Sequence, residues 1–377
     1  MTTTTGTTTA ATSSDGVLAA ARRLADLLDG HAAEADRTGQ LPPEVLKGLL
    51  DAGFARHFVP ARHGGTEGTF TDLAHAVRDV GTGCVSTAWV ALIYATAGRM
   101  AAFLPEAGQD ELWAEGPDVA VASALRPSGS ATLSGDTWTL TGRWDFLSGV
   151  DFAGWALLCV AGDACTGEPA QGVRYFAVPR DAWTVEQTWA PTGMRATASN
   201  SVHIDRVRVP RSRSFAHSRL LTGTDDPDAA ACYRAPLQGS GPPLFVAPAL
   251  GGAAQALTRW AERRTKRDDT ARLALARGTA ELDIAELLLD RSVAAADTPG
   301  MSRETVARVM RDAAVAARLV RDAVDRLVDL SGSAMLSEAD PLQRAWRDVR
   351  TATAHGALDL DRSSTQYVRD VWGWTHD

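Results

Sequence analysis

The residues best suited to chemistry fall in two short segments rich in hydroxyl groups. In GRWDFLSGVDFAGW, residues 142–155, an aromatic-rich strand-like run is interrupted at Ser148. Phe146 lies two positions earlier, and strand alternation predicts that both side chains share one face. The second segment, TGMRATASNS, is dense in hydroxyls and backbone donors and includes Thr197. Both could face a flat aromatic ligand, although Gly and Ser are also the commonest residues of ordinary turns.

Other familiar catalytic signatures are missing from the sequence. There is no P-loop, no HExxH and no GxSxG. The run GTGCVS, residues 81–86, follows a predicted helix and not a strand, so it does not fit a dinucleotide fingerprint. The eight histidines are scattered without metal-ligand spacing, and no metal site is predicted.

Composition limits the possible partners and compartments. A formal charge of −8 over 377 residues argues against broad nucleic-acid binding. No apolar run reaches the length of a membrane span. The four cysteines form no CxxC pair, which favours free thiols and a cytoplasmic location. Residues 1–15 are a Thr/Ser-rich stretch with no apolar signal-peptide core, and we expect a disordered tail there.

The elements that must position these residues divide the chain into three zones. Residues 16–117 have helical apolar spacing, and the segment from Ser86 to Pro105 is apolar nearly all round. Residues 118–218 contain short alternating runs split by Gly, Asp and Pro, which predicts a small antiparallel β domain. Residues 219–377 return to helical spacing typical of a bundle, ending in a long helix from about Leu342.

Four strings in this order resemble the acyl-CoA dehydrogenase fold. They are PARHGGTEG, GRWDFLSGVDFAGW, TGMRATASNSVHIDRVRVP and RAWRDVRTATAH. The resemblance covers nearly the whole chain after the tail. It implies a mainly α protein with a central β domain: an N-terminal helical domain, a β-barrel-like middle domain and a C-terminal four-helix bundle. Members typically form homotetramers and hold a flavin between the β domain and the bundle.

The resemblance assigns cofactor roles in the middle domain. Ser148 matches the family Thr that contacts flavin N5, and Phe146 matches the Trp that packs against the isoalloxazine. Ser123 lies near a second flavin-contacting turn, and Thr197 belongs to the hydroxyl-rich one. Gly149 would let the backbone approach the ring closely.

Two further positions match contacts to the flavin phosphates. Arg263 corresponds to an Arg that reaches a flavin phosphate across a subunit interface, although a solvated basic run on a helix explains it equally well. Gly332 falls in a Gly-rich turn beside the pyrophosphate, where backbone amides can come close.

Two departures from common dehydrogenases point to one branch of the fold. The pair His355-Gly356 stands where dehydrogenases carry Tyr and the catalytic Glu, and glycine cannot remove a proton. The turn reads L-S-G where dehydrogenases read I-T-N. These variants resemble two-component flavin-dependent monooxygenases, such as 4-hydroxyphenylacetate and natural-product hydroxylases. Such enzymes receive reduced FAD or FMN from a separate reductase and react it with molecular oxygen.

The expected function is therefore oxygenation of a small apolar aromatic or polycyclic natural product by a flavin hydroperoxide. Such a species survives only in a site that excludes water. Trp89 and Phe152 are expected to line an apolar substrate pocket. His355 is the candidate acid–base or substrate-orienting group, because imidazole titrates near neutrality, or else it is an ordinary packed histidine.

Two other functions remain open at this point. The first is an acyl-CoA dehydrogenase whose base has moved to another helix, with Glu281 and Glu286 as candidates. The second is a scaffold of the same fold that has lost its flavin.

Overall fold

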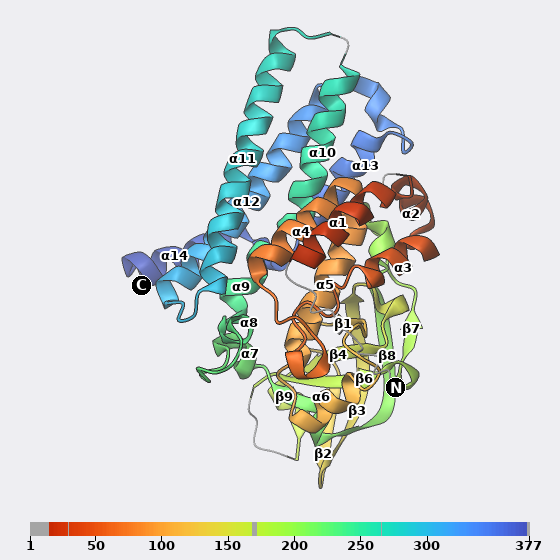
Figure 1. The fold of residues 1–377 in the computed structure, drawn as a ribbon, viewed down its shortest axis with the longest axis vertical. Helices are drawn as coiled ribbons and strands as arrows, with labels where there is room; N and C mark the ends of the chain where they lie inside the picture. Colours follow the sequence, from red (N-terminus) through yellow and green to blue (C-terminus); the bar gives the residue numbers. More distant parts are fainter. Residues whose placement is uncertain (1–14, 29, 168–171, 265, 375–377) are drawn as a thin grey trace, which may run out of the picture.

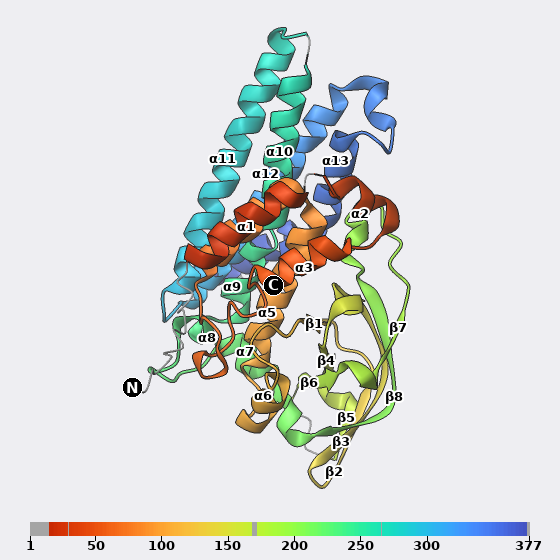
Figure 2. The same ribbon diagram turned by 45° about the vertical axis from the view of Figure 1, so that its right-hand side comes forward.

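The computed structural model describes residues 15–28, 30–167, 172–264 and 266–374. Long helices occupy one end of the molecule and the β-sheets the other, with the N-terminal helices packed between them (Figure 1). The same arrangement is visible after a 45° turn (Figure 2). The expected tail, residues 1–15, falls almost wholly outside the described residues.

The N-terminal zone is helical, as the apolar spacing predicts. Helix α4 begins after Thr69, whose side chain accepts a hydrogen bond from the amide of Asp72. Helix α5 is buried along almost its whole length, which explains its apolar composition all round. The helices are α1 (Asp15–Leu28), α2 (Ala32–Thr38), α3 (Pro43–Asp51), α4 (Phe70–Gly83), α5 (Val85–Ala101) and α6 (Glu106–Leu112).

The middle zone forms two sheets. One has the order β1-β4-β6-β9 and the other β5-β2-β3-β8-β7. The expectation of a purely antiparallel domain is wrong, because β1 pairs with β4 and β2 with β5 in parallel. The strands are β1 (Val121–Ser123), β2 (Ser130–Ser134), β3 (Thr137–Leu147), β4 (Trp155–Val160), β5 (Cys165–Thr166), β6 (Arg174–Pro179), β7 (Thr184–Glu186), β8 (Asn200–Pro210) and β9 (Ser214–Ala216).

The long β3–β8 ladder is irregular at the end that faces the helices. Its register shifts between Trp144 and Leu147. Within this bulge Phe146 has a φ of 65°, a left-handed conformation that is uncommon for a bulky residue. The bulge interrupts the regular strand alternation on which the prediction for Phe146 and Ser148 was based, although both residues still line one cavity.

The C-terminal zone contains three short helices and then a bundle. The short ones are α7 (Ser218–Thr222), α8 (Ala231–Arg234) and α9 (Leu237–Leu244). The bundle comprises α10 (Ala247–Arg263), α11 (Asp269–Asp297), α12 (Arg303–Asp329), α13 (Pro341–Ala352) and α14 (Leu360–Trp372). The single last helix expected from Leu342 is wrong: the chain breaks after Ala352, forms a short 3-10 turn at Gly356–Leu358, and restarts at Leu360.

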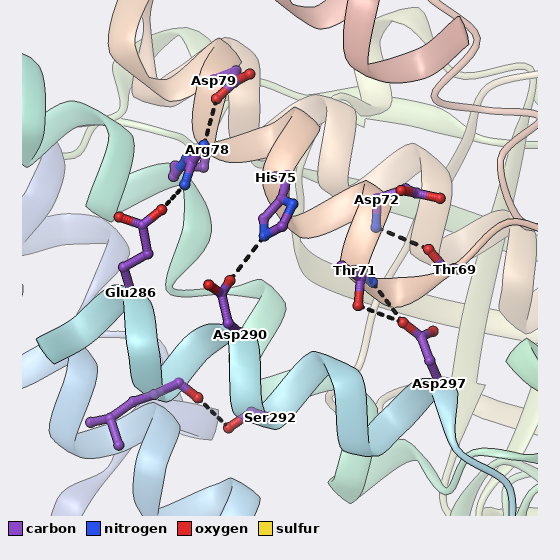
Figure 3. A network of polar contacts seen from close by, with 11 residues as sticks. Thr69, Thr71, Asp72, His75, Arg78, Asp79, Glu286, Asp290, Ser292 and Asp297 are labelled. Carbon is purple, nitrogen blue, oxygen red and sulfur yellow. Dashed lines mark hydrogen bonds and ion pairs between the residues drawn. The ribbon is translucent and has the colours of Figure 1, made fainter. Parts of the chain in front are cut away.

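A row of polar contacts joins α4 to α11 and so fixes the N-terminal helices on the bundle (Figure 3). The carboxylate of Asp297 accepts hydrogen bonds from the amides of Phe70 and Thr71 and from the Thr71 hydroxyl. His75 contacts Asp290 at 2.9 Å, and Arg78 pairs with Glu286. Within the described part of the chain, no helix is both long enough and apolar enough to span a membrane.

Candidate flavin site

A cavity of about 450 Å³ lies where the three zones meet, and we call it the central cavity. Helix α5 contributes Trp89 and Ile93 to its wall. The remaining lining residues come from the β-sheets and their loops and from the C-terminal zone: Ser123, Leu125, Arg126, Asp145, Phe146, Ser148, Trp189, Met194, Ser199, Phe245, Thr351, Ala354, His355 and Gly356. Ser123, Phe146, Ser148, Trp89 and His355 were all expected at the site, and the fold brings them to this one cavity.

A chain of hydroxyl groups leads from the cavity into the protein. Trp89 Nε1 donates to Ser148 Oγ at 3.1 Å, and Ser148 Oγ lies 2.8 Å from Ser199 Oγ. Ser199 Oγ is 2.7 Å from the hydroxyl of Thr197, which donates to the Met194 carbonyl at 3.0 Å. Ser148, Ser199 and Thr197 are all buried.

The direction of this chain follows from the single proton that each hydroxyl carries. Thr197 gives its proton to the Met194 carbonyl, so it must accept from Ser199. Ser199 in turn must accept from Ser148. Ser148 already accepts the Trp89 indole proton, and its one remaining lone pair can serve only as an acceptor toward the cavity.

Phe146 offers a large aromatic surface at the cavity wall. Its side chain is 59% exposed, and its ring lies edge-on to Trp189 at a centroid distance of 6.2 Å. An exposed phenyl ring held by a strained backbone is an uncommon arrangement unless a ligand covers it. The arrangement suits one face of a planar ring system.

His355 lies in the helix break and packs among aromatic rings. It stacks on Phe245 at 4.0 Å between centroids and lies edge-on to Trp89 at 5.6 Å. Burial lowers the pKa of His355 to about 4, so the imidazole is neutral at physiological pH. The expectation that it titrates near neutrality is therefore wrong. Nδ1 accepts the amide proton of Ala357 at 3.3 Å, which leaves Nε2 to carry the proton as a hydrogen-bond donor.

Helix α13 holds the hydroxyl-rich loop in place. The carboxylate of Asp348 accepts the Met194 amide at 2.5 Å, and Arg347 donates to the Thr192 carbonyl at 2.7 Å. Arg347 also forms a buried pair with Asp36 of α2 at 2.6 Å. Burial raises the pKa of Asp348 to about 6. The loop that ends at Ser199 is thus tied directly to α13 and, through Arg347, to α2.

Three predicted site residues have other contacts. Gly149 adopts φ 70°, and a Cβ there would lie 2.8 Å from the Tyr94 hydroxyl, so its glycine makes room for Tyr94 and not for a flavin. Thr197 acts through the hydroxyl chain and does not line the cavity. Phe152 packs against the main core and is absent from the cavity wall.

Arg263 belongs to a second cavity, which shares no lining residue with the central one. This arginine cavity, of about 180 Å³, is lined by Arg259, Arg263, Arg264 and Arg344 among others. Arg263 is bound to Asp340 at 3.0 Å. Gly332 adopts φ 66° in the turn beside it, and an added Cβ there would meet no atom within 4 Å.

The two candidates for a relocated base do not reach the central cavity. Glu281 pairs with Arg326 at 2.6 Å, and Glu286 pairs with Arg78. Among the described residues, Asp145 is the one carboxylate in the cavity wall, and it accepts a hydrogen bond from Ser201 at 2.7 Å. The geometry therefore gives no support to a dehydrogenase that uses either glutamate.

Sequence reasoning missed several residues of the wall. Ser199 lies in the hydroxyl-rich string TGMRATASNS, two positions after Thr197. This spacing was the signal that could have identified Ser199 as a site residue. Phe245 and Trp189 reach the cavity from distant segments, and no local pattern marks them.

Comparison with known proteins agrees with this architecture. Residues 16–114 match the model of the acyl-CoA dehydrogenase N-terminal domain, and residues 244–360 match that of the C-terminal domain. Together the two matches span more than half of the chain. This chain belongs to the acyl-CoA dehydrogenase family. The fold expected from the sequence is confirmed.

Relatives of this acyl-CoA dehydrogenase family member include oxygenase components. The flavin-dependent monooxygenase oxygenase subunit HsaA of Rhodococcus jostii is 29% identical over 93% of this chain and 96% of its own length. The oxygenase component of an FADH₂-dependent resorcinol hydroxylase from Rhizobium is 25% identical over 93% of this chain and 92% of its own length. The crystal structure of 3-HSA hydroxylase from Rhodococcus superimposes with a TM-score of 0.89 at 26% identity, over 96% of this chain and 98% of that one.

Proposed function

We propose that this protein is the oxygenase component of a two-component flavin-dependent monooxygenase that acts on an apolar aromatic substrate. The observation that carries the proposal is Gly356. At the position where the dehydrogenases of this family need a carboxylate, the wall of the central cavity has no side chain. The relatives named as oxygenase components cover nearly the whole chain and support the same reading.

The residues of the central cavity fit a reduced flavin. A reduced isoalloxazine carries a proton on N5, and the free lone pair of Ser148 Oγ is an acceptor for such a group. Phe146 and Trp189 provide apolar faces for a ring system. When bound, the flavin supplies the reducing equivalents for the activation of molecular oxygen. The protein's part is to bind the ring, to exclude water and to orient the substrate.

His355 has an orienting role in this proposal. Because its imidazole is neutral and Nδ1 is occupied, it would present Nε2–H to an oxygen of the substrate. It would not supply a proton by titration in the neutral range. Ser148 and His355 thus contribute an acceptor and a donor from different parts of the same wall.

The proposal also covers partners and assembly. The naming of the relatives as oxygenase subunits implies a separate flavin reductase. We propose that Arg263 and Gly332 serve the flavin phosphates of a neighbouring subunit in a homotetramer, since the cavity lined by Arg263, with Gly332 in the turn beside it, is separate from the central one. No two of the four cysteines, all of which the structure describes, form a disulfide with each other, which fits a cytoplasmic location. A titration that compares the affinities for FAD and FMN distinguishes the two flavins.

The decisive experiment supplies the protein with chemically reduced FAD or FMN, oxygen and a panel of apolar phenols. An oxygenated product containing one atom from ¹⁸O₂ is expected from at least one phenol. Hydrogen peroxide alone, with every phenol recovered unchanged, would contradict the proposal. A titration with both flavins separates this result from a scaffold, because a scaffold binds neither.

A further inference from the structure

A third cavity opens beside the central one at the helix break. This apolar annex, of about 240 Å³, is walled by Leu237, Pro242 and Met310. It shares Leu125, Phe245, His355 and Gly356 with the central cavity, so these residues form the boundary between the two spaces.

Gly356 is the residue of this boundary that contributes no side chain. Its φ is outside the left-handed region, and a Cβ built on it would meet no atom within 4 Å. The backbone therefore does not require glycine at this position, and any side chain would project into empty space. The lack of a side chain at Gly356 therefore leaves space at the boundary of the two cavities that a larger residue would fill.

A different cavity on the other side of the break has another character. It also touches His355 and Gly356, but its wall includes Arg318, Arg321 and Asp361. A hydrocarbon entering that space would strip water from charged groups at a cost. The annex presents far fewer polar groups: Gln238, Arg362 and Ser363.

We propose that the apolar annex binds the distal rings of the substrate while its oxygenated ring lies in the central cavity. The substrate class is an uncharged fused-ring compound longer than two rings, passing Gly356 and resting against Leu237, Pro242 and Met310. The inference rests on the proposed function for the identity of the oxygenated ring. The binding subsite itself rests on the two cavities and on Gly356.

The test compares two phenols of different length, 2-naphthol and estradiol. Their dissociation constants are measured by calorimetry on the full chain saturated with oxidised flavin, so no turnover is needed. Because burial of additional carbons favours binding, estradiol is expected to bind at least about tenfold more tightly than 2-naphthol. Gly356→Val is expected to reduce this preference by about tenfold, the usual effect of a few carbons in a closed pocket.

Gln238→Trp fills the annex from a wall that the central cavity does not share, and it should reduce the preference in the same direction. Gly30→Val is the matched control, since that glycine also has open space around its Cβ and no left-handed φ. The control should leave the ratio of the two constants unchanged.

Two results would overturn the proposal that the annex binds the distal rings. The first is equal affinity of the wild type for both phenols. The second is a ratio of the two dissociation constants that neither Gly356→Val nor Gln238→Trp changes. Product analysis with reduced flavin and oxygen is run in parallel. If the binding pattern holds and no oxygenated product forms, the proposed function fails while the annex stands.

Discussion

At the scale of single residues, the Ser148 hydroxyl is held by two partners that determine what its last lone pair can do. Trp89 donates to it and Ser199 accepts from it. Replacing Ser148 by alanine removes this acceptor and also leaves the Trp89 indole N–H and the Ser199 hydroxyl without their partner. A hydrogen bond of about 1.5 kcal/mol corresponds to roughly a tenfold change in a competing rate. We therefore predict that Ser148→Ala raises the ratio of hydrogen peroxide released to product formed by about tenfold.

The peroxide-to-product ratio separates this role from a structural one. Ser292 of α11 is a matched control, because it is buried and its hydroxyl donates to the Leu288 carbonyl far from the cavity. Ser292→Ala should leave the ratio unchanged. If Ser148→Ala behaves like the control, Ser148 is only a turn residue.

The next hydroxyl in the chain provides a second prediction. Ser199→Ala removes the group that receives the Ser148 proton. Ser148 can then rotate and donate toward the cavity, which places a proton against the N5–H of a reduced flavin. We expect the affinity for reduced flavin to fall while the affinity for oxidised flavin, which has no proton on N5, is retained or rises. Anaerobic titrations of both forms measure this, and a parallel loss of both affinities would contradict it.

The carboxyl of Asp348 makes a prediction about pH. Its pKa is raised from 3.8 to about 6 in the folded protein, so the folded state holds the proton more tightly than the unfolded state does. The contribution of the protonated Asp348 carboxyl to the free energy of unfolding is therefore fully present below about pH 4 and is lost as pH rises through 6. Asp348→Asn keeps an acceptor for the Met194 amide and removes the charge. As pH rises from 4 to 7, the free energy of unfolding of the variant should therefore increase by on the order of 2 kcal/mol relative to that of the wild type.

Urea unfolding at pH 4, 5, 6 and 7 measures the difference between the two proteins. The variant and the wild type are compared at each pH because many other carboxyl groups titrate in the same range and affect both proteins equally. A constant difference across this range would show that Asp348 is ionised in the folded protein.

At the scale of elements, the carboxylate of Asp297, at the end of α11, holds the start of α4. Asp297 accepts three hydrogen bonds, two of them from backbone amides that the helix itself cannot satisfy. Asp297→Ala should lower the free energy of unfolding by about 2 kcal/mol. Asp290→Ala, which removes a half-exposed partner of His75 in the same row (Figure 3), should cost less than about 1 kcal/mol. Equal losses in the two variants would contradict this view of the interface.

The helix break between α13 and α14 shows why the site was only partly predictable. The apolar composition of α5 is a local property, and the sequence alone predicts a buried helix in this segment. At residues 353–359 no proline interrupts the helical pattern, and the local signals are Gly356 and the capping residue Asp359, whose carboxylate accepts the Arg362 amide. Neither signal places His355 against Phe245, which is a tertiary contact between distant segments. The turn at Phe146 has the same explanation, since its left-handed φ depends on a bulge against β8.

At the scale of the whole molecule, the proposed function depends on one cavity where all three zones meet. The sequence alone divided the chain into these zones, but only the family resemblance predicted that a site lies between them. Trp89, Ser148 and His355 come from a helix, a strand end and a helix break, and each is positioned by packing with the others. Such a site has no sequence motif of its own, because its residues are brought together only by the tertiary fold.

The outer surface of the bundle carries the last prediction. Leu273, Ile284 and Leu287 of α11 are 69%, 47% and 69% exposed. Their spacing of 11 and 3 residues puts them on one face of the helix. A row of large apolar side chains in water favours burial against another subunit, as the proposed homotetramer requires. Leu287→Asp should therefore shift the sedimentation coefficient to that of a smaller species, whereas Leu221→Asp, at an exposed leucine of α7, should not. A Leu287→Asp protein that sediments like the wild type would place the subunit contact elsewhere.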